Sequence, residues 1–342
     1  MARVISLILI AALLLTGCSL GGREYTSSFF AEEYRKARTE KTAAETAPFK
    51  EEKSKEETDG SDEIGFMYEN ICYSDSDSPV NSLDSVSPYK SALAFNIDKT
   101  KILYSSNMHE RIYPASTTKL MTALIAIKHS EMDDIVTIDE DNCGISVAGA
   151  QLCGFTKDDT LTMRDLLYCL LVYSGNDAAI AIARHIGGSE RAFVKMMNSE
   201  AKELGCINTS FVNPHGLHDQ NHYTTAYDMY LIFNECLRYD SLKEIFKSDG
   251  YTVTINTTAG EQKMLYMEPT NLYFMGKYEA PYGITVYGGK TGDTYAAGKC
   301  IILYAEDHRG MGYITEVFGT STKDELYTSM NRIFNYILSA TT

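Results

Sequence analysis

The sequence predicts an α+β fold in which strands from both ends of the folded region share one antiparallel sheet, with a mostly helical subdomain inserted between them. Three observations predict it: strand-like runs near residue 91, helical periodicity from residue 114 to residue 237, and strand-like runs again after residue 250. A chain that passes from strands to helices and back to strands is typical of α+β architecture. We expect the folded domain to cover residues 88–342.

Two strands are expected at the start of this domain. Residues 91–97 and 101–104 are runs of strand-like composition, and Asp98-Lys99-Thr100 provides a tight turn between them. They are predicted to form a hairpin.

Helices are expected in the middle of the domain. After Pro114, apolar residues repeat at helical spacing at Leu120, Leu124 and Ile127. Four further segments have the same periodicity: 163–172, 177–185, 189–204 and 225–237.

The last third of the chain returns to strands. Strand-like runs occupy 251–256, 284–286, 299–304 and 312–317. A final amphipathic helix is predicted over 323–338, with Leu326, Met330, Ile333, Phe334 and Ile337 on one side. Only 52 residues follow Lys290, so we expect one closed sheet, one helix and no C-terminal β domain.

The N-terminus has the features of an export signal. Arg3 precedes an apolar run at 4–15, which is too short to span a bilayer and leads into Thr16-Gly17-Cys18. The sequence Leu-Thr-Gly-Cys resembles the lipobox of bacterial lipoproteins, whose cysteine becomes the lipidated first residue. We therefore expect a signal peptide at 1–17 and a lipid anchor on Cys18 at the outer face of the cell membrane. The alternative is an ordinary cleaved signal in which Cys18 has no role.

Residues 18–87 are predicted to form a disordered tether. They are rich in Glu, Lys, Thr, Ser and Ala and poor in large apolar groups, and a second polar stretch covers 73–87. Such a segment buries too little apolar surface to offset the entropy of ordering it.

Charge and composition narrow the classes of partner. The formal net charge is −15 with a pI near 4.9, whereas a nucleic-acid partner requires a basic face. With 44% hydrophobic and 23% charged residues, the chain has the composition of a globular protein.

Seven cysteines remain once Cys18 is set aside, so at least one has no intramolecular disulfide partner. Cys143 and Cys153 flank a short segment and could be bridged. Cys169 and Cys236 lie in apolar helical stretches and are expected to act as small core residues.

A nucleophile and a base are suggested where the loop after Pro114 enters a helix. The i to i+3 spacing of Ser116 and Lys119 places the hydroxyl and the amine on one face. A lysine can accept the serine proton if burial or another cation lowers its pKa. The alternative is a serine near a helix N-cap followed by an exposed lysine.

Two further segments have side chains suited to the same chemistry. Ser174-Gly175-Asn176 lies between two helical segments, although by itself it would indicate only a turn and a cap. Lys290-Thr291-Gly292 lies on a late strand after Gly288-Gly289, where glycine would let a ligand approach the backbone closely. Thr291 offers a hydroxyl and Lys290 a positive charge.

In this order the three segments resemble the motifs of the penicillin-recognising serine peptidases. The likeness is closer to the low-molecular-mass penicillin-binding proteins that act as D-Ala-D-Ala carboxypeptidases. It rests on the segments 113–119 (YPASTTK), 173–179 (YSGNDAA), 213–217 (NPHGL) and 223–228 (YTTAYD). It covers about residues 88 to 340 and implies a β-lactamase/transpeptidase-like fold.

The resemblance implies roles for individual residues in attack. Ser116 would attack the carbonyl of the penultimate D-Ala, and Lys119 would accept its proton. Ser174 would relay a proton to the leaving D-Ala, and the charge of Lys290 would tune this network. Water would then hydrolyse the acyl-enzyme, whereas a β-lactam would leave a slowly hydrolysed acyl group on Ser116.

The resemblance also implies a substrate-binding set. Asn176 would hold Lys119 and the substrate amide, and Thr291, next to Gly292, would bind the terminal carboxylate. The oxyanion would lie between the backbone N–H groups of Ser116 and Asp293. The implied partners are peptidoglycan stem peptides, and no cofactor is expected.

Two features bear on this assignment. The spacing of His215, His218 and His222 is compatible with a zinc site, but their segment has turn character and no helical His-Glu-x-x-His pattern, so no metal is expected. Some family members bind the carboxylate with an arginine, and residues 318–323 (FGTSTK) contain none. Carboxylate recognition would then rest on Thr291 and Lys290 alone, or on Lys323.

Three other activities are considered beside the carboxypeptidase. A DD-endopeptidase would cleave cross-links with the same site. A β-lactamase would need rapid deacylation, and the Glu-x-x-Leu-Asn segment that class A enzymes use for it is absent. An inactive envelope-binding protein would not need Ser116, Lys119, Ser174 and Lys290 together.

Overall fold

The computed structural model describes residues 25–26, 71–85 and 87–340. The expected signal peptide, Cys18 and most of the expected tether lie outside these residues. The chain divides into two compact units, residues 1–77 and residues 78–342. In the first unit, strand β1 (Tyr25–Thr26) pairs antiparallel with β2 (Cys72–Tyr73).

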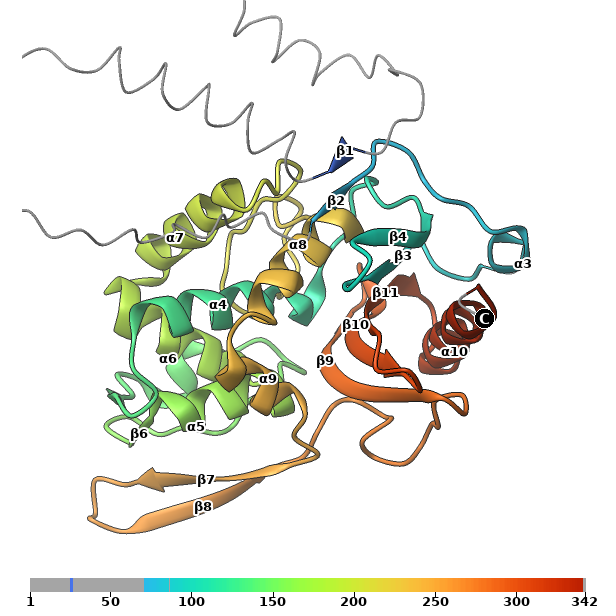
Figure 1. Ribbon diagram of the computed structural model, residues 1–342. Helices are drawn as coiled ribbons and strands as arrows, with labels where there is room; N and C mark the ends of the chain where they lie inside the picture. The colour runs from blue at the N-terminus through green and yellow to red at the C-terminus, as the bar shows by residue number, and fades with distance from the viewer. Residues whose placement is uncertain (1–24, 27–70, 86, 341–342) are drawn as a thin grey trace, which may run out of the picture. The chain divides into compact units, whose positions relative to one another are not determined.

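The second unit contains a five-stranded antiparallel sheet in the order β4-β3-β11-β10-β9 (Figure 1). Early and late parts of the chain meet where β3 pairs with β11, which confirms the predicted α+β sheet. The strands are β3 (Ser91–Asn96), β4 (Lys101–Ser106), β9 (Ile284–Thr294), β10 (Gly298–Asp307) and β11 (Gly312–Thr320). Because β9 is the last strand in this order, one of its sides is an edge of the sheet.

Helix α10 (Lys323–Ala340) packs on one face of this sheet (Figure 1). Its buried residues recur at the predicted helical spacing, and the same core cluster includes Ile301, Leu303 and Val317 of the sheet. This cluster is the core between α10 and the five-stranded sheet, and it also includes Ala92 and Ala94 of β3.

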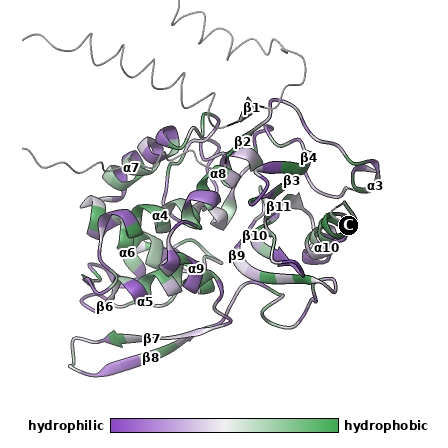
Figure 2. Cartoon of the chain, viewed as in Figure 1, coloured by the Kyte–Doolittle hydropathy of each residue, from purple (hydrophilic) through white to green (hydrophobic). Residues whose placement is uncertain are grey.

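A group of helices lies between β4 and β7 in the chain, and Phe95 of β3 packs on Tyr230 of this group with ring centroids 4.5 Å apart. Residues 119–126 are all buried, whereas α7 buries only one stripe. Figure 2 shows hydrophilic and hydrophobic residues mixed on α7. The elements are η1 (Ala115–Thr118), α4 (Lys119–His129), η2 (Asp141–Gly144), α5 (Met163–Tyr168), the π-helix η3 (Cys169–Tyr173), α6 (Asn176–Gly187), α7 (Glu190–Glu203), α8 (Ala226–Cys236) and α9 (Asp240–Phe246).

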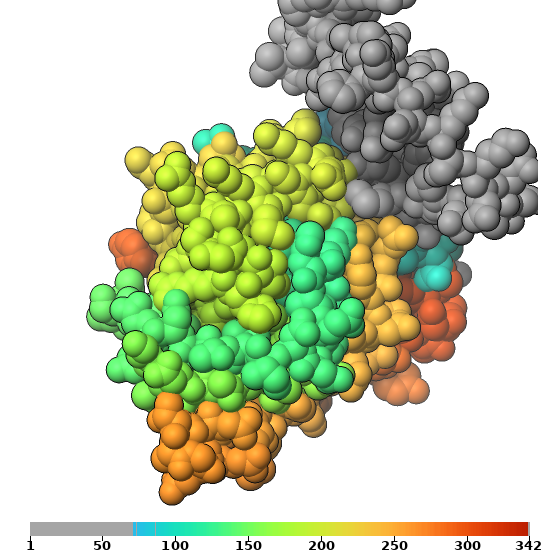
Figure 3. Space-filling view, turned by 90° about the vertical axis from the view of Figure 1, so that its left-hand side faces the viewer, coloured from blue at the N-terminus to red at the C-terminus, as the bar shows by residue number. Residues whose placement is uncertain are grey.

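A second sheet differs from the expected arrangement. The predicted strand at 251–256 does not join the main sheet; it is β7 (Tyr251–Asn256) of a four-stranded sheet in the order β5-β6-β7-β8. A turn in which the Gly260 N–H donates to the Thr257 carbonyl reverses the chain into a hairpin, and the hairpin projects from the helices (Figure 3). The other strands are β5 (Ile135–Thr137), β6 (Thr160–Thr162) and β8 (Gln262–Met267).

The start of the second unit lies about ten residues before the expected boundary at 88. The short helix α3 (Asn81–Asp84), which we had assigned to the tether, places Leu83 in the core cluster with 5% exposure. Asp84 accepts hydrogen bonds from Tyr104 and from the Val80 N–H. These contacts hold 78–85 on the domain, because one buried leucine and one paired carboxylate offset the cost of ordering a short polar segment.

Candidate active site

Ser116 lies in η1, the single 3-10 turn that precedes α4. Ala115, directly before it, has a φ of 49°, which is unfavourable for a residue with a Cβ atom. Two side chains brace the turn: Thr117 donates to the Pro114 carbonyl at 2.7 Å, and Thr118 donates to the Ala115 carbonyl at 2.8 Å. The strained backbone is therefore held by hydrogen bonds within the turn.

Lys119 begins α4 one turn after Ser116, and its side chain is fully buried. Its Nζ lies 3.1 Å from Ser116 Oγ, 2.8 Å from Asn176 Oδ1 and 2.7 Å from the His215 carbonyl oxygen. The amine is thus surrounded by one hydroxyl and two acceptors that have no proton to give.

The protonation state of Lys119 follows from this environment. Burial, together with the positive charge of Lys290, holds the pKa of Lys119 well below its usual value, and Asp177 and Cys153 oppose the shift. A neutral amine has two N–H donors and one lone pair. The Asn176 and His215 oxygens accept the two N–H groups, which leaves the lone pair for the Ser116 hydroxyl. The predicted pairing of Ser116 with Lys119 is present in a form suited to proton transfer.

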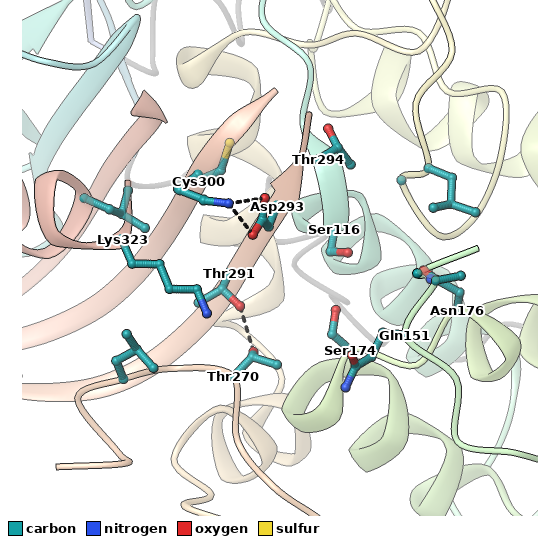
Figure 4. A pocket seen from close by; sticks show the side chains of 18 of the residues that line it. Ser116, Gln151, Ser174, Asn176, Thr270, Thr291, Asp293, Thr294, Cys300 and Lys323 are labelled. Atoms are coloured by element: carbon teal, nitrogen blue, oxygen red, sulfur yellow. Dashed lines mark hydrogen bonds and ion pairs between the residues drawn. The ribbon is translucent and has the colours of Figure 1, made fainter. Parts of the chain in front are cut away.

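Ser174 and Asn176 are positioned by the junction between η3 and α6. Ser174 adopts φ 71° and ψ 32°, a left-handed conformation that ends the π-helix. The Gly175 N–H donates to the Cys169 carbonyl, and the Asn176 N–H donates to the Gln151 carbonyl. In this conformation the Ser174 hydroxyl points toward Ser116 (Figure 4).

Asp177 fixes the neighbouring loop to the start of α6. Its buried carboxylate accepts hydrogen bonds from the N–H groups of Cys153, Gly154 and Ala178. A carboxylate at a helix N-terminus is favoured by the helix dipole as well as by these donors. The loop that supplies Gln151 to the site is therefore held by Asp177.

Lys290 and Thr291 come from the edge strand β9. Lys290 is 1% exposed, its Nζ donates to the Thr291 carbonyl at 2.8 Å, and burial lowers its pKa to about 7. The Thr291 hydroxyl donates to the Thr270 hydroxyl at 2.7 Å. Strand β9 thus contributes a buried lysine and a hydroxyl on the side of the site opposite Ser174.

Gly292 brings β9 against the nucleophile turn. A Cβ atom at this position would lie 3.0 Å from the Pro114 carbonyl oxygen and 3.2 Å from the Ser116 backbone nitrogen. Glycine therefore lets β9 approach the nucleophile turn more closely than a residue with a Cβ atom would, because such a residue would push the turn or the strand away by a few tenths of an ångström.

Gly288 and Gly289 have a different role from the one expected. A Cβ atom at Gly288 would be 1.9 Å from the Phe246 carbonyl oxygen, and one at Gly289 would be 2.1 Å from the Ile302 carbonyl oxygen. These glycines accommodate the protein's own backbone at a bulge in β9, so the expectation that they admit a ligand is wrong.

A pocket of about 440 Å³ lies between these elements (Figure 4). Most of the predicted site residues line it: Ser116, Ser174, Asn176, Thr291, Gly292 and Asp293. Lys119 and Lys290 do not line it and are buried behind it. The Asp293 carboxylate is bound by Lys299, whose Nζ lies 2.7 Å from both oxygens. The Asp293 carboxylate is therefore paired with a cation, although half of its side chain is exposed.

The histidines are occupied by structural contacts. His222 accepts the Val212 N–H at Nδ1, so its Nε2 carries the proton and donates to Thr118 Oγ1 at 2.8 Å. The His215 Nδ1 accepts the Leu217 N–H, and His218 packs edge-on against Tyr113. Burial is the main cause that lowers the pKa of His222 to about 4 and that of His215 to about 3. Across residues 71–85 and 87–340, no group of three His, Cys, Asp or Glu side chains has the arrangement of a metal site.

The cysteines near the site are thiols in this structure. Cys143 and Cys153, for which a bridge was considered, are both free. A hydrogen bond with Cys169, followed by burial, raises the pKa of Cys153 well above its usual value. The Cys153 thiol therefore forms a hydrogen bond with the Cys169 thiol and no disulfide with Cys143.

Several pocket residues were not predicted from the sequence, among them Gln151, Thr270 and Lys299. Lys299 could have been predicted. A short turn joins β9 to β10, so Gly298 pairs with Thr294 and Lys299 lies opposite Asp293. Gln151 and Thr270 lie in segments without regular structure and carried no sequence signal.

Comparison with known proteins gives consistent results. The chain is similar to the D-alanyl-D-alanine carboxypeptidase DacF of Bacillus subtilis, with 34% identity over 73% of this chain and 62% of that protein. It is also similar to a D-alanyl-D-alanine endopeptidase of Escherichia coli, with 28% identity over 62% of this chain and 66% of that protein. The carboxypeptidases DacA of Haemophilus influenzae and DacC of Escherichia coli are matched over 54% of their lengths, so this chain spans just over half to three fifths of these carboxypeptidase relatives.

The fold agrees with these relatives. The crystal structure of the Streptomyces K15 DD-transpeptidase superposes with a TM-score of 0.69 at 26% identity, covering 74% of this chain and 98% of that one. The family model described as D-alanyl-D-alanine carboxypeptidase matches residues 81–322, from the first residue of α3 to the residue before α10. Since this region carries the Ser116 turn, the Ser174 junction and strand β9, the chain belongs to the D-alanyl-D-alanine carboxypeptidase family of serine peptidases.

Proposed function

We propose that this protein is a serine-type D-Ala-D-Ala carboxypeptidase that removes the terminal D-Ala from peptidoglycan stem peptides through an acyl-enzyme on Ser116. The observation that carries the proposal is the environment of Lys119, a buried amine 3.1 Å from Ser116 Oγ with both N–H groups taken by carbonyl oxygens. This geometry makes Lys119 a proton acceptor for Ser116.

In the acylation step, Ser116 Oγ attacks the carbonyl carbon of the penultimate D-Ala while its proton passes to Lys119. The carbonyl oxygen becomes an oxyanion, which the backbone N–H groups of Ser116 and Asp293 stabilise from the helical side and from β9. Because β9 is an edge strand, its backbone can also pair with the extended peptide. Asn176 holds the substrate amide in line.

Departure of D-Ala requires a proton on its amine. Ser174, whose hydroxyl points toward Ser116, relays the proton from Lys119 to the leaving nitrogen (Figure 4). Lys290, buried behind the pocket, favours transfer away from Lys119 because two ammonium groups close together repel. Water then cleaves the ester and restores the Ser116 hydroxyl. A β-lactam acylates Ser116 in the same way and is released slowly.

Incubation of the purified protein with a D-Ala-D-Ala pentapeptide tests this proposal by release of free D-alanine. The Ser116→Ala variant should release none, whereas Ser130→Ala, at the C-terminal end of α4, should behave as wild type. No D-alanine from wild-type protein that is folded and binds the peptide would favour an inactive binding protein. Release of a penicillin acyl group within seconds would favour a β-lactamase. Digestion of cross-linked peptidoglycan in parallel separates the endopeptidase from the carboxypeptidase.

We further propose that the protein is exported and anchored to the outer face of the cell membrane through lipid on Cys18. The proposal is supported by the apolar run at 4–15 and the Leu15-Thr16-Gly17-Cys18 sequence that follows it. Within residues 71–85 and 87–340, no helix is long and apolar enough to cross a membrane. Cys18→Ala should give an active protein in the soluble fraction, and a variant that stays with the membrane would contradict lipid anchoring.

A further inference from the structure

The pocket extends to both sides of Ser116, and the terminal D-Ala accounts for only one of them. Thr291, the expected partner of the C-terminal carboxylate, lies on one side of Ser116, and Asn176 lies on the other (Figure 4). A stem peptide whose scissile carbonyl is held at Ser116 must therefore leave the pocket on the Asn176 side with the residues that precede the D-Ala pair.

The loop at 213–222 borders that side of the pocket. The amine of Lys119 contacts both the Asn176 amide oxygen, at 2.8 Å, and the His215 carbonyl oxygen of this loop, at 2.7 Å. Two residues later, Leu217 lines the pocket itself. The surface of this loop is therefore the first that the upstream part of the stem peptide meets.

Aromatic rings continue the surface beyond this loop. His218 is exposed and packs edge-on against Tyr113, with ring centroids 4.6 Å apart. An antiparallel bridge between Ile112 and Thr224 places Tyr113 across from Tyr223. Both tyrosines are partly exposed, so the rings form a strip of surface that begins beside the pocket.

Arg111 lies on this strip. Its guanidinium carbon is 3.5 Å from the centre of the Tyr223 ring, so the group is stacked on the ring. Arg111 is exposed, and no carboxylate within 71–85 and 87–340 forms an ion pair with it. Asp219 of the neighbouring loop accepts the Asn221 N–H at 2.7 Å instead. Stacking limits the orientations of the guanidinium and leaves its N–H edge for a planar anion such as a carboxylate.

Peptidoglycan stem peptides have a second free carboxylate, on the γ-linked D-glutamate that precedes the third residue of the stem. We infer that Arg111 binds this α-carboxylate, upstream of the cleaved D-Ala pair. The inference rests on the proposed function, since it names a further contact of the same substrate. It makes Arg111 a specificity-determining residue that takes no part in the chemistry at Ser116.

Reach and charge both support this contact. Arg111 precedes Ser116 by five residues, which span no more than about 18 Å. The stem covers about 10 Å between the scissile carbonyl and the D-glutamate carboxylate when extended, and the arginine side chain covers part of the remainder. The formal net charge of the protein is −15, so an unpaired arginine beside the pocket also counters the general repulsion of an anionic peptide.

The test compares two pentapeptides that differ in one group: L-Ala-γ-D-Glu-L-Lys-D-Ala-D-Ala, and its isoglutamine form, in which the α-carboxylate is an amide. For each peptide, kcat/KM for release of D-alanine is measured on wild type, Arg111→Met, Arg111→Lys and the control Arg191→Met, which replaces an exposed arginine of α7.

We expect Arg111→Met to lose about 5- to 30-fold in kcat/KM on the carboxylate form, which is the effect of a charge-assisted hydrogen bond at a partly exposed site. On the isoglutamine form it should lose less than about twofold, so the preference of wild type for the carboxylate should disappear. Arg111→Lys should recover part of the loss, because it keeps the charge but not the planar fork. Arg191→Met should match wild type on both peptides.

The outcomes separate this inference from the proposed function. If wild type releases D-alanine from neither peptide, the proposed function fails. If wild type cleaves the carboxylate form and Arg111→Met cleaves it equally well, the inference is wrong while the function stands. An equal loss on both peptides would also overturn it, because that pattern indicates a disturbed Ser116 turn rather than a lost carboxylate contact.

Discussion

Replacement of Asn176 by Asp tests whether Lys119 acts as a neutral base. In the native site the Asn176 amide oxygen accepts a hydrogen bond from Lys119 at 2.8 Å and adds no net charge. Asn176→Asp places a carboxylate at nearly the same position with little change in volume. A negative charge there favours the ammonium form, so the pKa of Lys119 should rise.

The size of the effect can be worked from the distance. Two unit charges 2.8 Å apart attract by about 6 kcal/mol at an effective dielectric constant of ~20. The carboxylate spreads its charge over two oxygens and loses hydration on burial, so we take a third of this value, ~2 kcal/mol. An energy of ~2 kcal/mol corresponds to about a 30-fold change in the equilibrium between the neutral and ammonium forms of Lys119, in favour of the ammonium, so the pKa of Lys119 should rise. At a pH below the pKa of Lys119 in the wild type, the neutral fraction of Lys119 and the acylation rate should therefore fall about 30-fold.

The assay is the rate of penicillin acylation of Ser116, measured from pH 5 to pH 10. Wild-type activity should rise with pH as Lys119 loses its proton, and in Asn176→Asp the same rise should appear at higher pH. Asn256→Asp is the matched control, because it adds the same charge on the exposed β7–β8 hairpin, far from the pocket. If the acid limb of Asn176→Asp coincides with that of wild type, the assignment of Lys119 as the base is wrong.

Three other substitutions have defined outcomes. Gly292→Val should lower kcat/KM by about 100-fold and destabilise the fold by about 1–3 kcal/mol, because its side chain would force β9 away from the Pro114 carbonyl and the Ser116 N–H; normal activity with normal thermal stability would contradict this. The native pKa of His222 is about 4, below the unfolded value, so its contribution to stability is present above pH ~6.5 and is lost as the pH falls toward 4. His215 adds a similar loss, so in urea unfolding the decrease in stability between pH 7 and pH 5 should be about 2 kcal/mol smaller in His222→Gln than in wild type. Glu316 is fully buried, and neither carboxylate oxygen has a hydrogen-bond partner among the described residues, so burial raises its pKa and any stabilisation is lost as the pH rises through that value. Glu316→Met should therefore raise the free energy of unfolding at pH 8 by about 1–4 kcal/mol. A less stable variant would show that the carboxylate has a partner.

The sequence predicted the main architecture because its strongest patterns reflect burial. The α10 spacing, the early hairpin and the helices between 114 and 237 all appear where the periodicity placed them. Strand β7 was assigned to the wrong sheet, because alternation predicts a strand but not its partner, and β8 was not predicted. Leu83 was missed for a similar reason, since one apolar residue in a polar stretch gives no periodic signal.

In the site as well, local features could be predicted from the sequence and tertiary contacts could not. Ser116 and Lys119 are three residues apart, so local helix geometry brings them together and the sequence could predict it. The acceptors that set the state of Lys119 come from 57 and 96 residues further along the chain. No local pattern specifies that the His215 backbone carbonyl, rather than its ring, contacts the catalytic amine. The chemistry of the pair therefore depends on tertiary contacts, although its identity is local.

The location of the site explains how two buried lysines are tolerated in one protein. Lys119 belongs to the helical subdomain and Lys290 to the main sheet, so the two amines meet only when both halves of the fold are formed. Each would be costly to bury in charged form, and each lowers that cost by releasing its proton more easily. Strain at Ala115 and Ser174 lies on the same boundary. We infer that packing of α8 and α10 on the sheet, and of α4 on α8, offsets this local cost. The nucleophile turn itself is held by the hydrogen bonds of Thr117 and Thr118 rather than by its own backbone preference.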